Sequence, residues 1–374
     1  MVNTLRDLFA TTFAREMILE QAKKVGAIQR LRDIHPADFG LSLASCAIGD
    51  EERSIATARR MFFDITQYMP EESSFYNKFN AGTVVLMKQL YLNALAGATK
   101  EQREVLAEVF KNTGILDIQA IDATQLTLPA SAAEEFPSTH DAHGGIKLTT
   151  TLSVLYQVIV GVSVSCSRTH DRKALCLPRW LHGRLLLLDR GYADFRLYAT
   201  IEDRKGYFLS PLKANVFPII KAIRVGLGQC HVGKPLDGTL PYQHIVDVDA
   251  EFKVRKGGRR IFRVVGVTVP HEMPNGTVEW VTLWFVTNLP ADTFTAEHVA
   301  TIYRFRWEVE TLFHTLKAVG RLDQLKTSNR YVIETFVYAT LLGMVLAHEI
   351  CAQMRRKRRE CEPSVYRVTA LLHR

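Results

Sequence analysis

YRFRWEVETLFHTLK, residues 303–317, has the apolar period of a helix packed against a domain core. The apolar residues of this stretch and its flanks fall on one arc: Ile302, Phe305, Val309, Leu312, Phe313, Leu316 and Val319. Four polar residues follow one another at steps of three, four and seven: Tyr303, Arg306, Glu310 and Lys317. At about 100° per residue these four lie within roughly 60° of one another, along about 21 Å of helix. The helix is therefore predicted to carry a line of polar side chains beside its core-facing surface.

Two interpretations of this polar line are open from the window alone. In the first, it is a solvated helix edge on which Arg306 and Glu310 form an ion pair at i,i+4. In the second, the four side chains share a binding or catalytic function. The rest of the chain has to decide between them.

The composition is that of a folded protein with more than one packed unit. The chain has 374 residues, of which 47% are hydrophobic and 23% charged, which is too apolar for a disordered chain. Its 47 Lys and Arg against 39 Asp and Glu give a net charge of +8, which favours a polyanionic partner without identifying one. The six cysteines form no CxxC pair, which argues against a zinc ribbon or a disulfide scaffold and indicates reduced thiols in the cytoplasm.

No segment of the sequence is predicted to be a signal peptide or a membrane span. The apolar stretch near the N-terminus is interrupted by polar and charged residues. The run FVYATLLGMVLA, residues 336–347, is too short to cross a bilayer and is expected to form a buried helix. We therefore expect no membrane partner.

The texture of the sequence changes several times along the chain. Residues 1–112 read as several short helices, and residues 113–213 alternate β-rich runs with a helix. Residues 214–294 combine glycines with alternating runs and are predicted to form a β-rich insertion. The helix quoted above belongs to residues 295–350, and a basic segment occupies residues 351–374. The expected fold class is α/β with a small helical domain in front.

Two aspartates occupy unusual places in the predicted strands. Asp122 interrupts the apolar strand IQAIDATQLTL, residues 118–128, where an isolated carboxylate would be costly to bury. Asp189 follows four leucines in RLLLLDRGY, at the carboxyl end of a strand, where open sheets place functional groups. A capping or turn role for Asp189 is equally open.

Together with Glu310, these aspartates would supply three carboxylates to one site. Such a set can hold two Mg²⁺ ions about 4 Å apart, the arrangement that activates water and stabilises the leaving oxygen in phosphodiester displacement. Hard cations prefer oxygen ligands, and the sequence offers no convincing His or Cys cluster. Mg²⁺ or Mn²⁺ is therefore the expected cofactor.

The spacing Tyr303-x2-Arg306-x3-Glu310-x6-Lys317, with two upstream aspartate-bearing strands, resembles the signature of the bacterial insertion sequence 4 family of DDE transposases. The resemblance extends from ESSFYNKF, residues 72–79, through TNLP, residues 287–290, to the helix after Lys317. It implies a ribonuclease H-like catalytic core with a mixed sheet, interrupted by the β-rich insertion.

The resemblance also implies roles for individual residues. The metal ligands and catalytic residues would be Asp122, Asp189 and Glu310. The terminal phosphates of the transposon end would be bound by Tyr303, Arg306 and Lys317. Residues 113–213 and 295–350 would form the two parts of the core, and residues 1–112 would bind the DNA end.

The expected function is cut-and-paste transposition of an insertion sequence. Metal-activated water would cleave double-stranded DNA at the inverted repeats, and the freed 3′-hydroxyl would attack the opposite strand or the target DNA. The resemblance adds a hairpin intermediate and a homodimer in a synaptic complex. We expect a bacterial cytoplasmic protein that associates with the nucleoid when it acts.

One tryptophan of the insertion is a candidate for DNA binding. In related enzymes that form hairpins, an aromatic side chain of the insertion covers a base pulled out of the stack. VEWVTLWFVTNLP, residues 278–290, offers Trp280 and Trp284 on one strand face, and we favour Trp284. The family places its tryptophan four residues before the threonine, which here is Leu283. The alternative is that both indoles pack in the core of the insertion.

Three other functions are compatible with parts of the sequence. A metal-dependent nuclease or Holliday-junction resolvase would cut DNA without joining strands. An inactive relative would only bind DNA, although the three intact carboxylates argue against it. A glycosidase would use paired carboxylates but would leave the basic line without a purpose. Relatives continue beyond the end of this sequence, so a truncated C-terminus is an open alternative.

Overall fold

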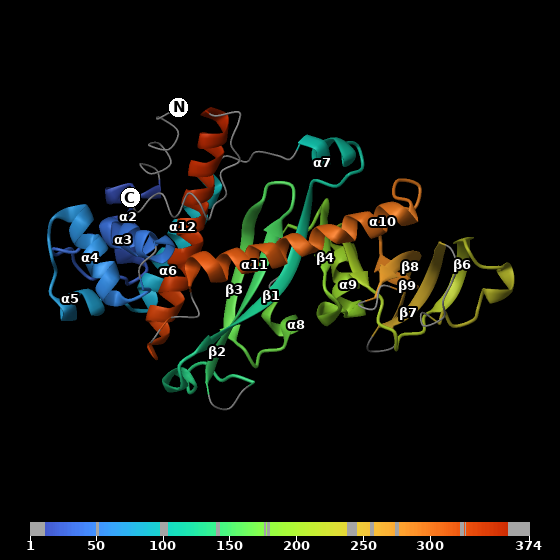
Figure 1. The fold of residues 1–374 in the computed structure, drawn as a ribbon, viewed down its shortest axis with the longest axis horizontal. Coiled ribbons are helices and arrows are strands. Elements are labelled where there is room, and N and C mark those ends of the chain that lie inside the picture. Colours follow the sequence, from blue (N-terminus) through green and yellow to red (C-terminus); the bar gives the residue numbers. More distant parts are fainter. Residues whose placement is uncertain are drawn as a thin grey trace.

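The computed structural model describes residues 12–49, 52–97, 104–139, 143–175, 177, 180–237, 245–254, 258–273, 277–321, 325 and 327–357. The protein is elongated, with a helical unit at one end and a β-rich unit at the other (Figure 1). One mixed sheet connects the two ends.

The N-terminal unit consists of short helices, and two of them show clear start signals. They are α2 (Arg15–Lys24), α3 (Pro36–Ile48), α4 (Ile55–Thr66), α5 (Glu72–Tyr76), α6 (Ala81–Gly97) and α7 (Glu104–Val109). Helix α3 begins with proline at its first position, where no intrahelical N–H bond is lost. Helix α4 begins after Ser54, whose hydroxyl accepts a hydrogen bond from the Thr57 amide at 3.1 Å. These local signals agree with the helical texture of the sequence.

Helix α12 (Arg330–Lys357), the last helix in the described part of the chain, completes the core of the helical unit. It packs against α6 and α3. At Gly343 it approaches α3 so closely that an added Cβ would lie 2.4 Å from a methyl group of Ile48. Residues Arg330–Ile350 are long and apolar enough to span a membrane, but 83% of that apolar window is buried inside the protein. The predicted buried helix at residues 336–347 is therefore confirmed as part of a longer core helix.

The stability of the helical unit is expected to depend on pH through His35. Its Nδ1 accepts a hydrogen bond from the Ala37 amide at 3.2 Å and caps α3. Burial, and then the nearby Arg15, lower the pKa of His35, while Asp38 opposes the shift. A neutral imidazole is needed because a protonated one has no acceptor. Between the folded and unfolded pKa values the unfolded chain binds the extra proton, so the free energy of unfolding should fall as pH falls below about 6.5.

Urea unfolding at several pH values checks this prediction. His35→Asn should keep the cap, because asparagine is a good N-cap residue, and should lose this part of the pH dependence. His35→Ala should cost about 1 kcal/mol near neutral pH. If the free energy of unfolding of His35→Asn falls with pH as steeply as that of the wild type, the pH dependence comes from other groups.

Within the described residues, the sheet has nine strands in the order β3-β2-β1-β4-β5-β9-β8-β7-β6. The strands of its first half are β1 (Asp117–Leu128), β2 (Gly144–Ser153), β3 (Val158–Cys166), β4 (Arg184–Leu188) and β5 (Tyr207–Pro211). Strands β1, β4 and β5 are parallel, while β2 and β3 form an antiparallel hairpin beside β1. Short helices lie between them: α8 (Asp171–Ala174) and α9 (Phe195–Asp203). The predicted β-rich runs of residues 113–213 all form strands.

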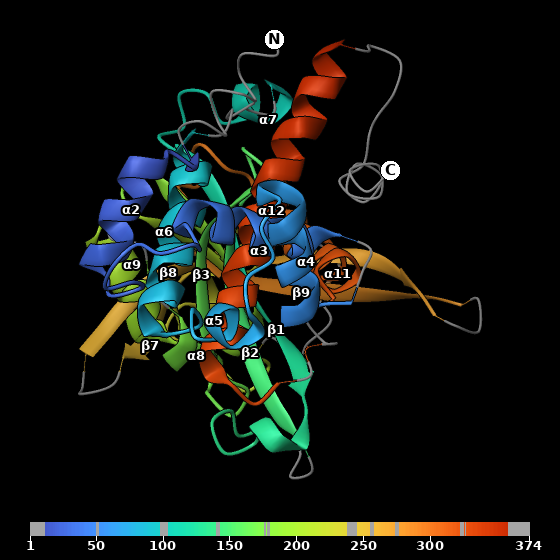
Figure 2. The same cartoon turned by 90° about the vertical axis from the view of Figure 1, so that its left-hand side faces the viewer.

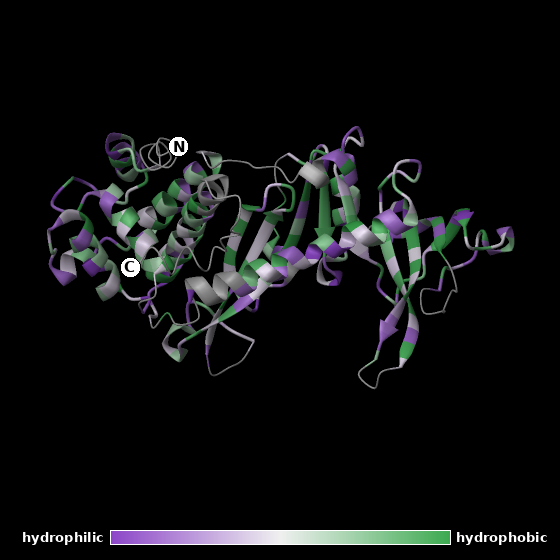
Figure 3. Cartoon of the chain, turned by 45° about the horizontal axis from the view of Figure 1, so that its top comes forward, coloured by the Kyte–Doolittle hydropathy of each residue, from purple (hydrophilic) through white to green (hydrophobic). Residues whose placement is uncertain are grey.

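The centre of the sheet is apolar on both faces. Four leucines of β4, residues 185–188, are fully buried, and Figure 3 shows predominantly green, hydrophobic strands in this region. Leu185 and Leu187 belong to the core shared with the helical unit, whereas Leu186 and Leu188 belong to a second core beneath α9. Burial on both faces explains why this strand has a continuous apolar sequence.

The β-rich insertion extends the same sheet. Its strands are β6 (Ile219–Val225), β7 (Val246–Val254), β8 (Gly258–Glu272) and β9 (Val278–Thr287). They form an antiparallel meander, and β9 pairs with β5 through Leu209 opposite Thr287. Beyond that pairing, β8 and β9 continue as a two-stranded ribbon that projects from the body of the protein (Figure 2). The insertion therefore shares hydrogen bonds with the rest of the sheet.

The helix that carries the sequence signature differs from the single helix predicted for residues 303–317. Helix α10 (Ala296–Tyr303) ends at the tyrosine, a 3₁₀ turn occupies Arg304–Arg306, and α11 (Trp307–Gly320) follows. Helix α11 crosses β1 and β2 on the face of the sheet that holds the helical unit (Figure 1). Short 3₁₀ segments inside helical stretches often mark strained or functional positions. Here the 3₁₀ turn contains Arg306.

Candidate active site

The sheet brings Asp122 and Asp189 together. Strands β1 and β4 are parallel neighbours, and their register pairs Ile121 with Leu188. Asp122 follows the first of these residues and Asp189 follows the second, so the two carboxylates leave adjacent strands at the same level. Glu310 reaches this region from the first turn of α11, which packs against β1. Three residues that are far apart in sequence therefore lie in the same region, beside the central strands β1 and β4.

Arg306 joins two of these carboxylates. Its Nη1 lies 3.2 Å from Oδ2 of Asp122, and its Nη2 lies 2.8 Å from Oε1 of Glu310. The arginine side chain is 9% exposed, whereas those of Asp122 and Glu310 are 20% and 33% exposed. The i,i+4 ion pair between Arg306 and Glu310 that the sequence predicted is present. The same guanidinium also binds Asp122 of strand β1, so it connects α11 to that strand. The ion pair of the first interpretation is therefore present, but Arg306 is buried and does not lie on a solvated helix edge, and the shared function of the second interpretation stays a prediction.

The carboxyl group of Asp122 has an unusual environment. Burial raises its pKa to about 6, and the neighbouring Asp189 and Glu310 act in the same direction. The Ala123 amide, which donates to Oδ1 at 2.7 Å, and the Arg306 guanidinium oppose the shift. A buried carboxylate beside two others is costly without added positive charge. The group is therefore suited to binding a cation.

Asp189 is held by a turn. Its Oδ2 accepts a hydrogen bond from the Gly191 amide at 3.2 Å, which caps the 3₁₀ turn Arg190–Tyr192. The predicted capping role is thus present alongside the position next to Asp122. Among the described residues, no group of three His, Cys, Asp or Glu side chains is close enough to form a ready metal site. Asp122 and Glu310 both form ion pairs with the Arg306 guanidinium. Asp189 lies nearby but does not complete a three-residue metal site with them.

Tyr303 lines the same region on the side of the insertion. Its hydroxyl donates to the Leu188 carbonyl oxygen at 3.4 Å, directly before Asp189. Its ring packs on Phe285 of β9, with ring centroids 5.1 Å apart. Burial raises the pKa of Tyr303, so the phenol remains protonated and can donate a hydrogen bond. The residue connects the signature turn to both the core strand and the insertion.

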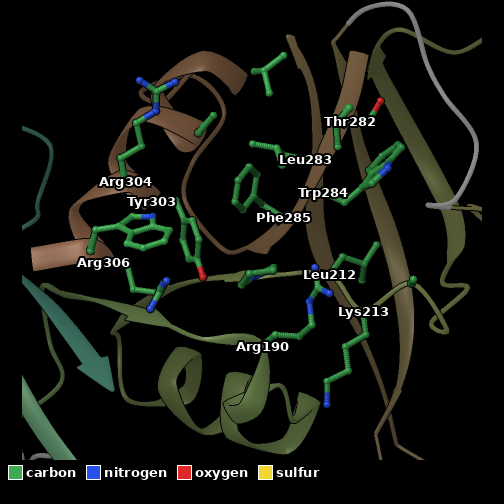
Figure 4. Close-up of a pocket in the computed structure, with 16 residues that line it drawn as sticks. Arg190, Leu212, Lys213, Thr282, Leu283, Trp284, Phe285, Tyr303, Arg304 and Arg306 are labelled. Carbon is green, nitrogen blue, oxygen red and sulfur yellow. The ribbon is translucent and has the colours of Figure 1, made fainter. Parts of the chain in front are cut away.

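A pocket of about 550 Å³ lies between the insertion and the signature turn, by which we mean Tyr303 and the 3₁₀ turn Arg304–Arg306. Figure 4 shows Tyr303 and Arg306 together on one side of it and Trp284 on the other, with Arg190 and Lys213 below. The pocket thus combines aromatic surface with cationic side chains. Nucleic-acid sites commonly use this combination to hold bases and phosphates.

The two tryptophans of β9 have different environments. Both face the same side of the strand, as predicted, because they pair with Gly266 and Pro270 of β8. Trp284 is 7% exposed, and its ring lies across Gly266, where an added Cβ would be 2.7 Å from the indole. Trp280 is 67% exposed near the end of the ribbon. Trp284 lines the pocket, whereas Trp280 does not.

Several site residues did not stand out in the sequence. Trp307 stacks on Arg306, with the guanidinium carbon 5.2 Å from its ring centroid. Arg190 and Arg304 line the pocket, each next in sequence to a predicted site residue. An arginine directly after Asp189, and another directly after Tyr303, were signals that could have been used. The side chain of Lys317 lies outside the described part of the structure, so its predicted role remains a prediction.

The strand order β3-β2-β1-β4-β5, with acidic residues on β1, after β4 and on α11, defines a ribonuclease H-like α/β protein. The chain belongs to the family described as "Transposase DDE domain", whose model matches residues 114–346. The fold class and the family resemblance predicted from the sequence are both confirmed.

The individual relatives that the chain resembles are transposases. The chain is 20% identical over 347 residues to the transposase for insertion sequence element IS231F of Bacillus thuringiensis subsp. israelensis, covering 79% of this chain and 69% of that protein. It is also 20% identical over 348 residues to the IS231E transposase of Bacillus thuringiensis subsp. finitimus, covering 82% and 72%. A shorter segment of 65 residues is 37% identical to the transposase for IS421 of Escherichia coli. That segment spans 17% of this chain and 18% of the IS421 protein.

Proposed function

We propose that this protein catalyses cut-and-paste transposition of an insertion sequence. The observation that carries the proposal is the convergence of Asp122 and Glu310 on Arg306, with Asp189 directly after the neighbouring strand, within a transposase DDE domain. The substrate would be double-stranded DNA at the inverted repeats of the element, followed by target DNA. The protein would act in the bacterial cytoplasm on nucleoid DNA.

The carboxylates would hold Mg²⁺ or Mn²⁺. Their oxygen donors suit hard cations, and Asp122 is a partly buried acid whose pKa is raised mainly by burial and also by the neighbouring Asp189 and Glu310. The ligands would be Asp122, Asp189 and Glu310. When bound, the ions would lower the pKa of water and stabilise the charge that develops on the leaving oxygen.

The side chains around the carboxylates would position the DNA strand. Arg306 and Tyr303 present hydrogen-bond donors beside the acidic residues, as phosphate oxygens require. Arg190, Lys213 and Arg304 add positive charge along the pocket. Arginine can contact a phosphate through two parallel N–H groups, which fixes orientation as well as charge. The line of donors beside Glu310 therefore suits a DNA backbone that passes over the active site.

Two further assignments accompany this proposal. Residues 1–112 would bind the DNA end, and two copies of the protein would join two ends in a synaptic complex. The net charge of +8 supports a polyanionic partner. Chemical crosslinking with and without a DNA end would reveal the dimer.

The purified protein should be incubated with Mg²⁺ and a DNA end taken from the sequence that flanks its own gene. Hairpin and strand-transfer products would support transposition. Cleavage of intact ends, with no strand transfer of precleaved ends, would favour a nuclease or resolvase on the same fold. Binding without cleavage would favour an inactive DNA-binding relative.

Lys317→Ala is expected to weaken binding to DNA ends and to reduce its salt dependence. If Lys317 neutralises one phosphate, the slope of log K against log salt should fall by about one unit. Titrations at several salt concentrations measure the slope. Lys221→Ala is a matched control, because Lys221 is an exposed lysine outside residues 1–112 and outside the pocket, and it is paired with Glu251 at 3.4 Å. Equal slopes for wild type and Lys317→Ala would remove Lys317 from the DNA contacts.

Trp284 would stack on a base extruded near the cleaved end. The position of its ring in the wall of the pocket supports this role, and base stacking contributes about 1–3 kcal/mol. Because the ring also packs on Gly266, Trp284→Phe is a milder change than Trp284→Ala. Hairpin formation by Trp284→Phe should be slower on an intact end and should recover on an end that lacks the candidate base.

The exposed Trp280 provides the control for this experiment. Trp280→Phe should form hairpins at the wild-type rate, because Trp280 does not line the pocket. If the abasic end does not rescue Trp284→Phe, or if that variant unfolds, Trp284 packs the insertion and captures no base.

A further inference from the structure

Arg306 lies between the carboxylates of Asp122 and Glu310, two of the proposed metal ligands. Its guanidinium bridges Asp122 and Glu310 at 3.2 and 2.8 Å, and its side chain is 9% exposed. The aromatic rings of Tyr303 and Trp307 lie 5.8 and 5.2 Å from the guanidinium carbon. The arginine is therefore a resident counter-ion of the acidic residues.

A carboxylate oxygen cannot offer the same lone pair to a guanidinium and to a metal ion at once. The two cations would also repel each other at contact distance in a partly buried site. Any ion that uses the bridged oxygens of Asp122 and Glu310 must therefore compete with Arg306. This competition opposes metal binding in the free protein.

The present position also leaves Arg306 incompletely satisfied. Its Nε is buried and has no hydrogen-bond partner among the described residues. An unpaired buried donor costs about 1–3 kcal/mol. Arg306 also lines the pocket beside Tyr303 and Arg304, so an acceptor that enters from this side could reach it (Figure 4). A phosphate could accept from Nε and a second guanidinium nitrogen together.

We propose that Arg306 is a latch that blocks the carboxylates until a DNA phosphate binds it. In the free protein the arginine neutralises Asp122 and Glu310 and keeps strand β1 and helix α11 together. When a phosphate enters, the guanidinium turns to it, and the carboxylate oxygens become available. DNA binding and metal binding then favour each other, as thermodynamic linkage requires. Such coupling would limit cleavage by protein that holds no DNA end.

This inference rests on the proposed metal-binding role of the carboxylates, and its test separates the two ideas. Mn²⁺ alone is titrated into the full chain without DNA, and bound Mn²⁺ is measured by electron paramagnetic resonance. Arg306→Gln should bind Mn²⁺ about tenfold more tightly than wild type, which corresponds to about 1.4 kcal/mol. Arg306→Lys should have an intermediate effect, because a lysine keeps the charge but has no fork to bridge two carboxylates.

Arg304→Gln is the matched control. Arg304 is exposed and lines the same pocket, and Arg304→Gln removes the same charge as Arg306→Gln. Among the described contacts, however, Arg304 forms no ion pair with Asp122 or Glu310. Its Mn²⁺ affinity should remain close to wild type. If Arg304→Gln gains Mn²⁺ affinity to a similar extent, the loss of any nearby positive charge is enough to explain the effect of Arg306→Gln. That result would overturn the latch.

A second arm adds a short DNA duplex and subtracts the Mn²⁺ bound by the duplex alone. The duplex should tighten Mn²⁺ binding to the wild-type protein more than to Arg306→Gln. Equal Mn²⁺ affinity of folded wild type and Arg306→Gln without DNA would overturn the latch while leaving the metal site intact. Wild-type Mn²⁺ affinity in Glu310→Gln, with and without DNA, would instead overturn the metal site itself. Circular dichroism confirms that each variant is folded.

Discussion

Glu310→Gln is expected to lose DNA cleavage by more than about a hundredfold while it still binds DNA ends. Substitutions of residues that hold metal ligands in place already cost about 10- to 100-fold, so loss of Glu310 as a proposed direct ligand should cost more. The same result is expected for Asp122→Asn and Asp189→Asn. DNA binding should persist because phosphate contacts supply most of the affinity. Cleavage of a labelled end and a filter-binding titration measure the two properties separately.

The control for this experiment has to be chosen from the structure. From the helical period, Glu308 lies away from the site, but its carboxylate accepts a hydrogen bond from the side chain of Gln157 in the β2–β3 turn. Glu297, an exposed residue in the first turn of α10, is therefore the better control, and Glu297→Gln should cleave at the wild-type rate. Cleavage by Glu310→Gln at more than a few per cent of that rate would remove Glu310 from the catalytic residues.

The sequence predicted the strands and the acidic positions because both depend on local patterns. A charge inside an apolar run at Asp122, and another directly after four leucines at Asp189, are visible without any contact information. Hydrophobic periodicity also predicted the buried side of the signature helix, where Val309 and Phe313 are buried. These features follow from which face of an element must leave water.

The bridge formed by Arg306 could not be predicted in full. The i,i+4 spacing revealed its bond to Glu310, but the bond to Asp122 joins residues 184 positions apart and depends on how α11 lies over β1. The 3₁₀ turn that holds Arg306 was also missed, because its apolar period is nearly that of the flanking helices. Tertiary placement decides both features.

The difference between Trp280 and Trp284 has a similar origin. Strand alternation correctly placed both indoles on one face. It could not show that the ribbon leaves the body of the protein between them, so that Trp284 packs on Gly266 while Trp280 meets solvent. Residues on one face of a strand change from buried to exposed at the point where the structure packed on that face ends.

Arg263→Met is expected to destabilise the protein by about 3–5 kcal/mol, the usual cost of removing one partner of a buried ion pair. Arg263 is 4% exposed on β8 and binds both oxygens of Asp247 on β7, at 3.0 and 2.6 Å. Its Nη1 donates to the carbonyl oxygens of Leu289 and Phe294 at 3.2 and 2.8 Å. These carbonyls belong to the loop that leads into α10. Loss of Arg263 leaves a buried carboxylate and two carbonyls without this donor.

Urea unfolding of three variants tests this expectation. Arg259→Met should cost at most about 1 kcal/mol, because Arg259 is 63% exposed and its ion pair with Glu251 is on the surface. The double variant Arg263→Met with Asp247→Leu should recover part of the loss, since the single variant leaves the buried Asp247 with only the more distant Arg224, at 3.4 Å, and the double variant removes that carboxylate. Its recovery should remain incomplete because the Leu289 and Phe294 carbonyls still lack their donor. Full recovery would mean that the insertion is held by the ion pair alone and that Arg263 does not anchor the loop that precedes Tyr303 and Arg306.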